Sequence, residues 1–105
     1  MAIHPALQID RRAIADFCRR WEITEFGVFG SALREDFRAD SDVDVMVAFA
    51  PDARWTLLDI LRTEDELGRI LHRKADLVER DAVERSENYI RRRHILSTVE
   101  QVYAA

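Results

Sequence analysis

The sequence predicts a single α/β (α+β) domain over residues 1–105, and three observations support this prediction. First, 105 residues with 48% hydrophobic content suit one core, and two ordinary domains would need a longer chain. Second, helix-type and strand-type hydrophobic spacings alternate along the chain, as they do in α/β and α+β proteins. Third, no stretch is rich enough in Pro, Gly or Ser to form a linker between two domains.

The first third of the chain predicts one helix and one strand. Residues 10–20 are expected to form a helix because Asp10 can accept hydrogen bonds from the free amides of its first turn. Apolar residues recur there at helical spacing: Ile14, Phe17, Cys18 and Trp21. Residues 23–30, "ITEFGVFG", then predict a strand that Gly30 and Ser31 end.

The middle of the chain predicts a turn, a second strand and a long helix. Residues 31–36, "SALRED", are typical of a short helical turn, and residues 41–49, "SDVDVMVAF", predict a strand that Pro51 closes. Residues 55–71 are expected to form a helix because their apolar positions keep i, i+3 and i+4 relations. These positions are Leu57, Ile60, Leu61, Leu67, Ile70 and Leu71.

The last third of the chain predicts a strand, a helix and a final strand. Residues 74–79, "KADLVE", indicate a short strand bounded by charges. A helix is expected over about 87–97, and residues 98–103, "TVEQVY", predict a strand at the edge of the sheet.

Composition excludes several classes of protein. The net charge of −4 argues against a nucleic-acid binder that works by bulk attraction to phosphates. The longest apolar runs are far shorter than a membrane span, and "MAIHPALQIDRR" lacks the features of a signal peptide. Cys18 is the only cysteine, so no disulfide can form within the chain. A cytoplasmic location is the simplest expectation.

Asp42 and Asp44 stand at the start of the strand predicted over 41–49, although strands tend to avoid aspartate. Strand side chains alternate between two faces, so both carboxylates point the same way with their Cα atoms roughly 7 Å apart. Like charges this close repel unless a cation lies between them, and Mg²⁺ prefers one or two carboxylates with phosphate oxygens. The alternative interpretation places both aspartates on a solvent face or in the preceding turn.

Gly30 and Ser31 predict a place for phosphate beside these acids. A glycine lets the backbone approach a ligand closely, and a helix N-terminus offers free N–H groups to an anion. The hydroxyl of Ser31 could add a further hydrogen bond. The alternative is that Gly30 only turns the chain and Ser31 only caps a helix.

Asp76 is a third acid within a short apolar strand, residues 74–79. If this strand lies beside the strand over 41–49, Asp76 can face the same cavity as the other two acids. Three carboxylates next to a phosphate-binding turn would form a two-metal site for a triphosphate. Asp76 would then take the proton from an attacking hydroxyl or complete the coordination of the second metal.

Taken together, these residues resemble the signature of the polymerase-β-like nucleotidyltransferase superfamily, in which "GS" is followed by ten residues and then "DVD". The run "FGSALREDFRADSDVDVMVAF" (29–49) resembles the minimal nucleotidyltransferases, the small stand-alone members. The run "RKADLVERDAVERSENYIRRRHIL" (73–96) is similar to their third-acid strand and the tail after it. The likeness covers roughly residues 23–103, within one minimal nucleotidyltransferase domain over 1–105.

The resemblance implies a small mixed β-sheet flanked by helices, with ATP as donor and Mg²⁺ as cofactor. Carried over position by position, Gly30 and Ser31 would hold the phosphates of the nucleotide. Asp42, Asp44 and Asp76 would be the catalytic carboxylates and the metal ligands.

Arg34 is a further position where the resemblance suggests a nucleotide contact. Many relatives read Gly-Ser-x-x-Arg-Gly, and here Arg34 is kept while Glu35 replaces the glycine. That replacement bears on the shape of the turn after Ser31 and leaves the metal site intact. The alternative for Arg34 is a surface ion pair with Asp36 or Asp40.

The resemblance also implies a partner. Members of this size are often encoded beside a HEPN-type ribonuclease toxin, which they silence as antitoxins by attaching AMP to a tyrosine hydroxyl. A 105-residue domain that holds ATP and two metals has little surface left for an acceptor, so we expect a protein acceptor or a second chain that completes the site. Two alternatives are an antitoxin that neutralises the toxin by binding alone, and a transferase acting on a small molecule.

Other conspicuous residues predict packing rather than chemistry. The basic run at 91–94, "RRRH", could meet an acidic partner or the triphosphate, but a solvated helix face is the favoured interpretation. Cys18 is expected in the core, and Trp21 and Trp55 are expected to pack beside helices. The three histidines show no spacing typical of a metal site.

Overall fold

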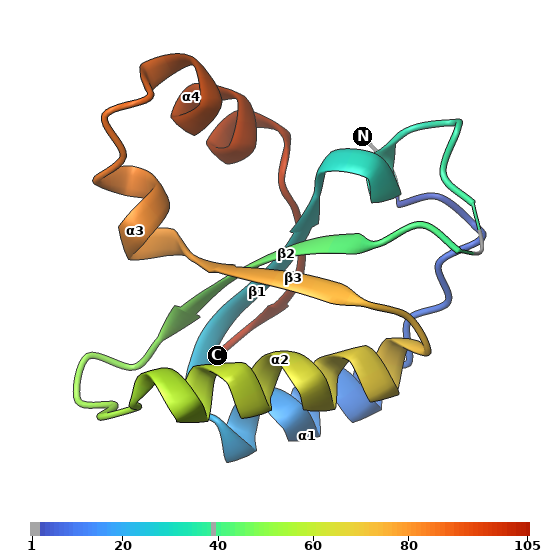
Figure 1. Cartoon of the computed structure of the whole chain (residues 1–105). Helices are drawn as coiled ribbons and strands as arrows, with labels where there is room; N and C mark the ends of the chain where they lie inside the picture. Colours follow the sequence, from blue (N-terminus) through green and yellow to red (C-terminus); the bar gives the residue numbers. More distant parts are fainter. Residues whose placement is uncertain (1–2, 39) are drawn as a thin grey trace.

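The computed structural model describes residues 3–38 and 40–105; residues 1–2 and 39 of the predicted domain lie outside this part (Figure 1). The chain forms one four-stranded sheet with helices on both faces. In chain order the elements are α1 (Arg11–Arg20), β1 (Ile23–Phe29), the 3₁₀ helix η1 (Gly30–Leu33), β2 (Val43–Phe49), α2 (Leu57–Leu71), β3 (Ala75–Glu79), α3 (Arg80–Glu84), α4 (Tyr89–Thr98) and β4 (Glu100–Ala104).

The sheet is mixed, with the strand order β3-β2-β1-β4. Strand β1 is antiparallel to both β2 and β4, whereas β2 and β3 are parallel. The parallel pair requires a crossover, which the 15-residue helix α2 supplies. The predicted fold class is confirmed. The expectations that the third strand lies beside the second, and that the chain's last strand is an edge strand, are also confirmed.

The two faces of the sheet carry different helices, with α1 and α2 on one face and α3 and α4 on the other (Figure 1). The larger core cluster includes Phe17 of α1, Val45 of β2 and Leu67 of α2. A second cluster under α3 and α4 consists of Phe29, Met46, Val83 and Ile95. Because strand side chains alternate, Val45 and Met46 reach opposite clusters, and the even-numbered residues of β2 face α3 and α4.

The predicted ends of the first two long helices are largely confirmed. Asp10 accepts hydrogen bonds from the amides of Arg12 and Ala13, so α1 begins where its cap predicts. Helix α2 begins after Thr56, which exchanges hydrogen bonds with Asp59 in a capping box. The core placement of Cys18 is confirmed, and burial raises the pKa of its thiol to about 12.

The predicted apolar face of α2 is partly wrong. Leu57 and Leu61 are 76% and 54% exposed, and the buried positions are Thr63, Leu67 and Leu71. Successive helix residues turn by about 100°, so Leu61 points about 200° away from Thr63. The hydroxyl of Thr63 donates to the carbonyl of Asp59 at 2.8 Å, and this bond makes a buried threonine tolerable.

The C-terminal region contains one helix more than predicted. The expected helix over 87–97 corresponds to α4, but α3 directly follows β3 and was not predicted. An ion pair within this short helix, between Arg80 and Glu84 at i and i+4, contributes to holding it. The packing role of the tryptophans is confirmed, because Trp21 and Trp55 meet edge to face with ring centroids 5.1 Å apart.

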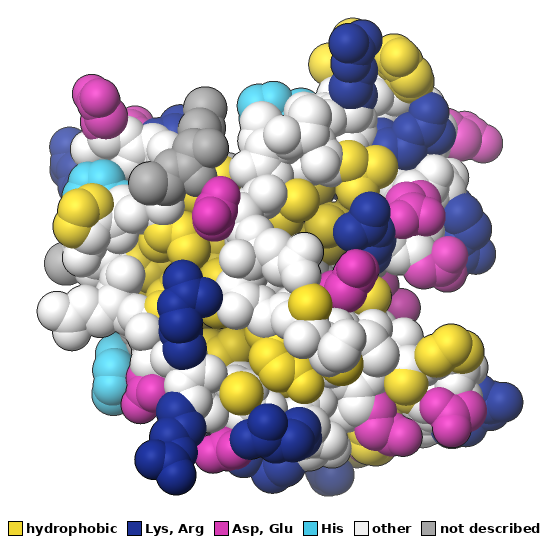
Figure 2. All heavy atoms as spheres, turned by 180° about the vertical axis from the view of Figure 1, so that it is seen from behind, with side chains coloured by type: hydrophobic (Ala, Val, Ile, Leu, Met, Phe, Trp, Pro, Cys, Tyr) yellow, Lys and Arg dark blue, Asp and Glu magenta, His cyan; other side chains and the backbone are white. Residues whose placement is uncertain are grey.

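The surface carries no large field of one sign on the face seen in Figure 2, where acidic and basic side chains are interspersed. Within the described residues, no helix combines the length and the hydrophobicity needed to cross a bilayer.

Candidate functional site

Two of the three predicted acids lie directly beside each other in the sheet. Asp44 of β2 and Asp76 of β3 are register partners on the parallel pair, and both are partly buried. Asp42 precedes β2, is exposed, and lies two residues before Asp44. All three therefore belong to the start of the β2–β3 pair, on the face that α3 and α4 cover.

Ser31 of η1 forms a hydrogen bond with each of two acidic residues, Asp42 and Asp44. Its hydroxyl donates to the backbone carbonyl of Asp42 at 3.0 Å, and its backbone N–H donates to the carboxylate of Asp44. These two bonds fix the start of β2 against the turn after β1. Ser31 therefore has a role in positioning the acids in addition to any contact with a ligand.

Gly30 is required by the conformation of this turn. Its φ of +69° lies in the left-handed region, where residues with a Cβ are strained. A Cβ built on Gly30 would lie 2.5 Å from the Oδ2 atom of Asp44. The glycine thus lets the carboxylate of Asp44 lie directly against the backbone.

The electrostatic surroundings of Asp44 make its negative charge unfavourable. Burial raises the pKa of Asp44 first, and the nearby charges of Asp76 and Asp42 raise it further. The N–H of Ser31 and the positive charge of Arg91 act in the opposite direction without cancelling the effect. A raised pKa caused by burial and like charges is typical of a functional site.

The acids fit a divalent cation, since they supply hard oxygen donors and their mutual repulsion would fall when a cation binds. Within residues 3–38 and 40–105, no three Asp, Glu, His or Cys side chains converge as ligands of one ion. The arrangement therefore offers carboxylates in pairs, which Mg²⁺ prefers together with phosphate oxygens and water. The roles predicted for Asp42, Asp44 and Asp76 as metal ligands stay predictions.

The two basic features singled out in the sequence, Arg34 and the run at 91–94, have different surroundings. Arg34 forms an exposed ion pair with Asp36 at 3.3 Å, which is the alternative that the sequence left open for it. Arg91, from the run interpreted as a solvated face, is close enough to Asp44 to act on its charge. The signal that distinguishes Arg91 is its place one helical turn before the buried Ile95.

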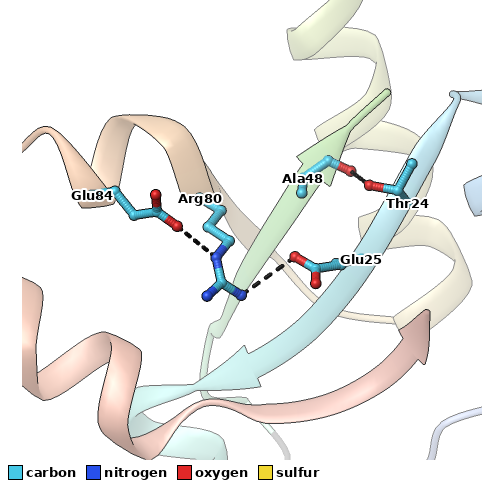
Figure 3. A network of polar contacts seen from close by, with 5 residues as sticks. All are labelled: Thr24, Glu25, Ala48, Arg80 and Glu84. Atoms are coloured by element: carbon cyan, nitrogen blue, oxygen red, sulfur yellow. Dashed lines mark hydrogen bonds and ion pairs between the residues drawn. The ribbon is translucent and has the colours of Figure 1, made fainter. Parts of the chain in front are cut away.

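The opposite end of the same two strands contains a cavity of about 480 Å³. Its lining includes Trp55, Arg80 and Glu84 and lies at the C-terminal ends of β2 and β3, away from the three aspartates. Arg80 bridges Glu84 at 2.7 Å and Glu25 at 3.3 Å, so the charges there are paired (Figure 3). We therefore place the candidate site at the end of the strands that carries the unpaired acids, and not at this cavity.

A family model described as a nucleotidyltransferase domain matches residues 10–100, which include every predicted site residue. The chain belongs to this nucleotidyltransferase family. Membership agrees with the motif that joins Gly30, Ser31, Asp42 and Asp44, and it makes a nucleotide the substrate class to consider.

Three similar proteins refine this comparison. The chain is 39% identical over 59 residues to the protein adenylyltransferase MntA of Thermococcus cleftensis, a stretch covering 56% of this chain and 58% of that relative. The matched part thus spans little more than half of the length of this relative. A solved structure assigned as a minimal nucleotidyltransferase is 31% identical, with a TM-score of 0.65 and 86% of each chain covered.

The third comparison is with a chain from the complex of a tri-AMPylated Shewanella oneidensis HEPN toxin with its MNT antitoxin. The TM-score is 0.61 at 18% identity, and the match covers 90% of this chain and 70% of that one. At this identity the likeness concerns the fold. It agrees with the mixed sheet flanked by helices that the resemblance in sequence implies.

Proposed function

We propose that this chain is a Mg²⁺-dependent nucleotidyltransferase that transfers AMP from ATP to a tyrosine hydroxyl of a HEPN-type toxin and thereby acts as an antitoxin. The proposal takes residues 1–105 as one minimal nucleotidyltransferase domain. The observation that carries it is the pair of carboxylates at Asp44 and Asp76, in register on adjacent strands and beside Gly30 and Ser31. A cation and a phosphate together would complete this arrangement.

The transfer exchanges a phosphoanhydride bond of ATP for a phosphoester bond to the acceptor oxygen. The acceptor oxygen attacks the α-phosphorus of ATP, the bond to the bridging oxygen breaks, and pyrophosphate leaves with the electron pair. Asp76, on the strand beside Asp44, accepts the proton of the acceptor hydroxyl or completes the coordination of the second metal. Asp42 and Asp44 hold Mg²⁺, which when bound neutralises developing charge on the phosphate oxygens.

The other predicted residues bind the nucleotide in this proposal. The backbone of Gly30 leaves room for close approach, and Ser31 keeps the acids of β2 in place while facing the phosphates. Arg34 stays a predicted phosphate contact, and it would have to leave its exposed ion pair with Asp36 to serve as one.

The similar proteins support both the donor and the partner. One is an adenylyltransferase, and another match is to a complex in which a HEPN toxin carries AMP groups. Both descriptions imply transfer of AMP, for which ATP is the natural donor. A cytoplasmic location, which the sequence predicts, fits ATP as the donor.

The experiment tests transfer of AMP to a HEPN-type toxin as the acceptor. The purified chain, labelled ATP and Mg²⁺ should label that protein, and the double variant Asp42→Asn/Asp44→Asn should lose this activity while its circular dichroism stays native. Chelation of the metal should have the same effect. Undiminished labelling by the double variant would contradict the proposed mechanism. Rescue of toxin-expressing cells by the inactive variant would favour neutralisation by binding alone.

A further inference from the structure

Helix α4 carries three consecutive arginines whose surroundings differ. The guanidinium of Arg92 is engaged, since it donates to the carbonyl of Ser86 at 3.1 Å and stacks on the ring of Tyr89. Within the described residues, the guanidinium groups of Arg91 and Arg93 have neither an ion pair nor a hydrogen bond. Both side chains are exposed. Arg91 and Arg93 are therefore comparable except in the direction they face.

Packing orients Arg91 toward the acids. Ile95 is buried in the cluster that contains Met46, and Arg91 precedes Ile95 by one turn on the same face of α4. Met46 in turn follows Asp44 by two residues and shares its face of β2. Helix α4 covers this face of the sheet (Figure 1). One turn back along α4 and two residues back along β2, Arg91 and Asp44 therefore belong to the same side of the sheet.

A cavity separates Arg91 from the edge of the sheet. It measures about 130 Å³ and is lined by Arg91, Val83 and Val78 among others. Val78 follows Asp76 by two residues on β3, so this cavity adjoins the face that carries the second acid.

We propose that Arg91 binds the phosphates of the nucleotide, an inference that rests on the proposed function. The exposed guanidinium of Arg91 and its position one turn before the buried Ile95 place a cation on the side of the sheet where a polyphosphate held at Asp44 would lie. A guanidinium presents paired donors that match phosphate oxygens. A chain of net charge −4 also needs a local cation to receive a polyanion.

The test compares Arg91→Gln with the matched control Arg93→Gln. In titration calorimetry with Mg²⁺ and ATP, loss of a charge-assisted bond should weaken the binding of ATP by Arg91→Gln ~10- to 100-fold. Arg93→Gln should bind ATP as the wild type does, and Arg91→Lys should fall between. Both glutamine variants should keep the wild-type unfolding temperature, because neither guanidinium contacts other protein groups.

A second measurement separates contact with phosphate from support of the carboxylates. The affinity for Mn²⁺ alone, measured by electron paramagnetic resonance, should not fall in Arg91→Gln, because the lost guanidinium is a cation and does not ligate the metal. An equal loss of Mn²⁺ and ATP affinity would overturn the inference, and so would wild-type ATP affinity in Arg91→Gln or an equal loss in Arg93→Gln. A wild-type chain that binds no ATP would instead contradict the proposed function itself.

Discussion

The two ends of the β2–β3 pair treat charge in opposite ways. At one end, Asp44 and Asp76 are like charges in register on neighbouring strands, and burial with this neighbour raises the pKa of Asp44. At the other end, Arg80 lies between Glu25 and Glu84 and bonds to both, which raises the pKa of the guanidinium (Figure 3). At the Arg80 end, the protein's own side chains pair the charges. At the Asp44 end, the negative charges repel each other, and a bound cation would reduce this repulsion.

This difference separates charges that support the fold from charges that serve function. Exposed ion pairs such as those of Arg80 contribute modestly to stability and hold short elements in place. A pair of like charges in a partly buried position destabilises the fold. Such pairs are typical of functional sites, where a bound ligand can reduce the repulsion. Four substitutions test this contrast.

Asp44→Asn should have the largest effect on activity and the least damaging effect on stability. Loss of the carboxylate that we propose holds Mg²⁺ should lower AMP transfer by ~100-fold or more. The unfolding temperature should stay equal or rise, because the amide removes repulsion from Asp76. Steady-state rates and calorimetric unfolding measure the two effects. A large fall in stability would contradict the view that Asp44 is kept for its ligand.

Gly30→Ala should damage both activity and stability. The alanine must adopt a φ of +69°, which costs about 1–2 kcal/mol for a residue with a Cβ. Its methyl group would also displace the carboxylate of Asp44, from which it would lie 2.5 Å away, so AMP transfer should fall ~10-fold or more.

The control for Gly30 is Gly27→Ala in β1. A Cβ at Gly27 would lie 2.6 Å from Cγ2 of Val99, so this variant should also lose stability. It lies away from the acids, and the molecules that remain folded should transfer AMP normally. Equal specific activities in the two folded variants would contradict the role of Gly30 in placing Asp44.

The site could be predicted from sequence where local rules determine it. Alternation along the strand places Asp42 and Asp44 on one face, and a parallel neighbour brings Asp76 beside Asp44, so strand geometry and the motif spacing predict this arrangement. Gly30 followed from the break after a buried strand. The positive φ and the close approach to Asp44 explain why the residue is glycine.

Features that depend on tertiary packing could not be predicted in the same way. Arg91 and Arg93 are indistinguishable in the sequence, and only the burial of Ile95 against the sheet gives Arg91 its direction. The apolar residues Leu57 and Leu61 suggested the buried face of α2, but the line through Thr63 and Leu67 packs against the sheet instead. Hydrophobic spacing predicts the presence of a helix more reliably than it predicts which side of that helix is buried.

Arg80→Ala tests the balanced end and should have a small effect. Its side chain is 42% exposed, so loss of both ion pairs should cost about 0.5–1 kcal/mol in urea unfolding. AMP transfer should stay unchanged, because the site lies at the other end of the strands. The cost should shrink in high salt, where exposed pairs are screened. A cost independent of salt would indicate that packing of the arginine stem, not charge, dominates.

Glu66→Gln should have the smallest effect, visible chiefly as a change in pH dependence. Burial alone would raise the pKa of Glu66, but hydrogen bonds from Arg20 at 2.9 Å and Trp21 at 2.8 Å outweigh it and lower this pKa. A depressed pKa gives stability that is present above the unfolded pKa of about 4.3 and is lost as pH falls through the folded value.

Between about pH 5 and pH 3, the wild type should therefore lose a few tenths of a kcal/mol more unfolding free energy than Glu66→Gln. Urea unfolding of both proteins at several pH values measures this difference directly. The glutamine can still accept from Trp21, so the comparison isolates the charge from the hydrogen bond. Identical pH profiles would show that the pairing of Glu66 with Arg20 adds nothing to stability. The contrast between balanced and unbalanced charge would then depend on the Arg80 end alone.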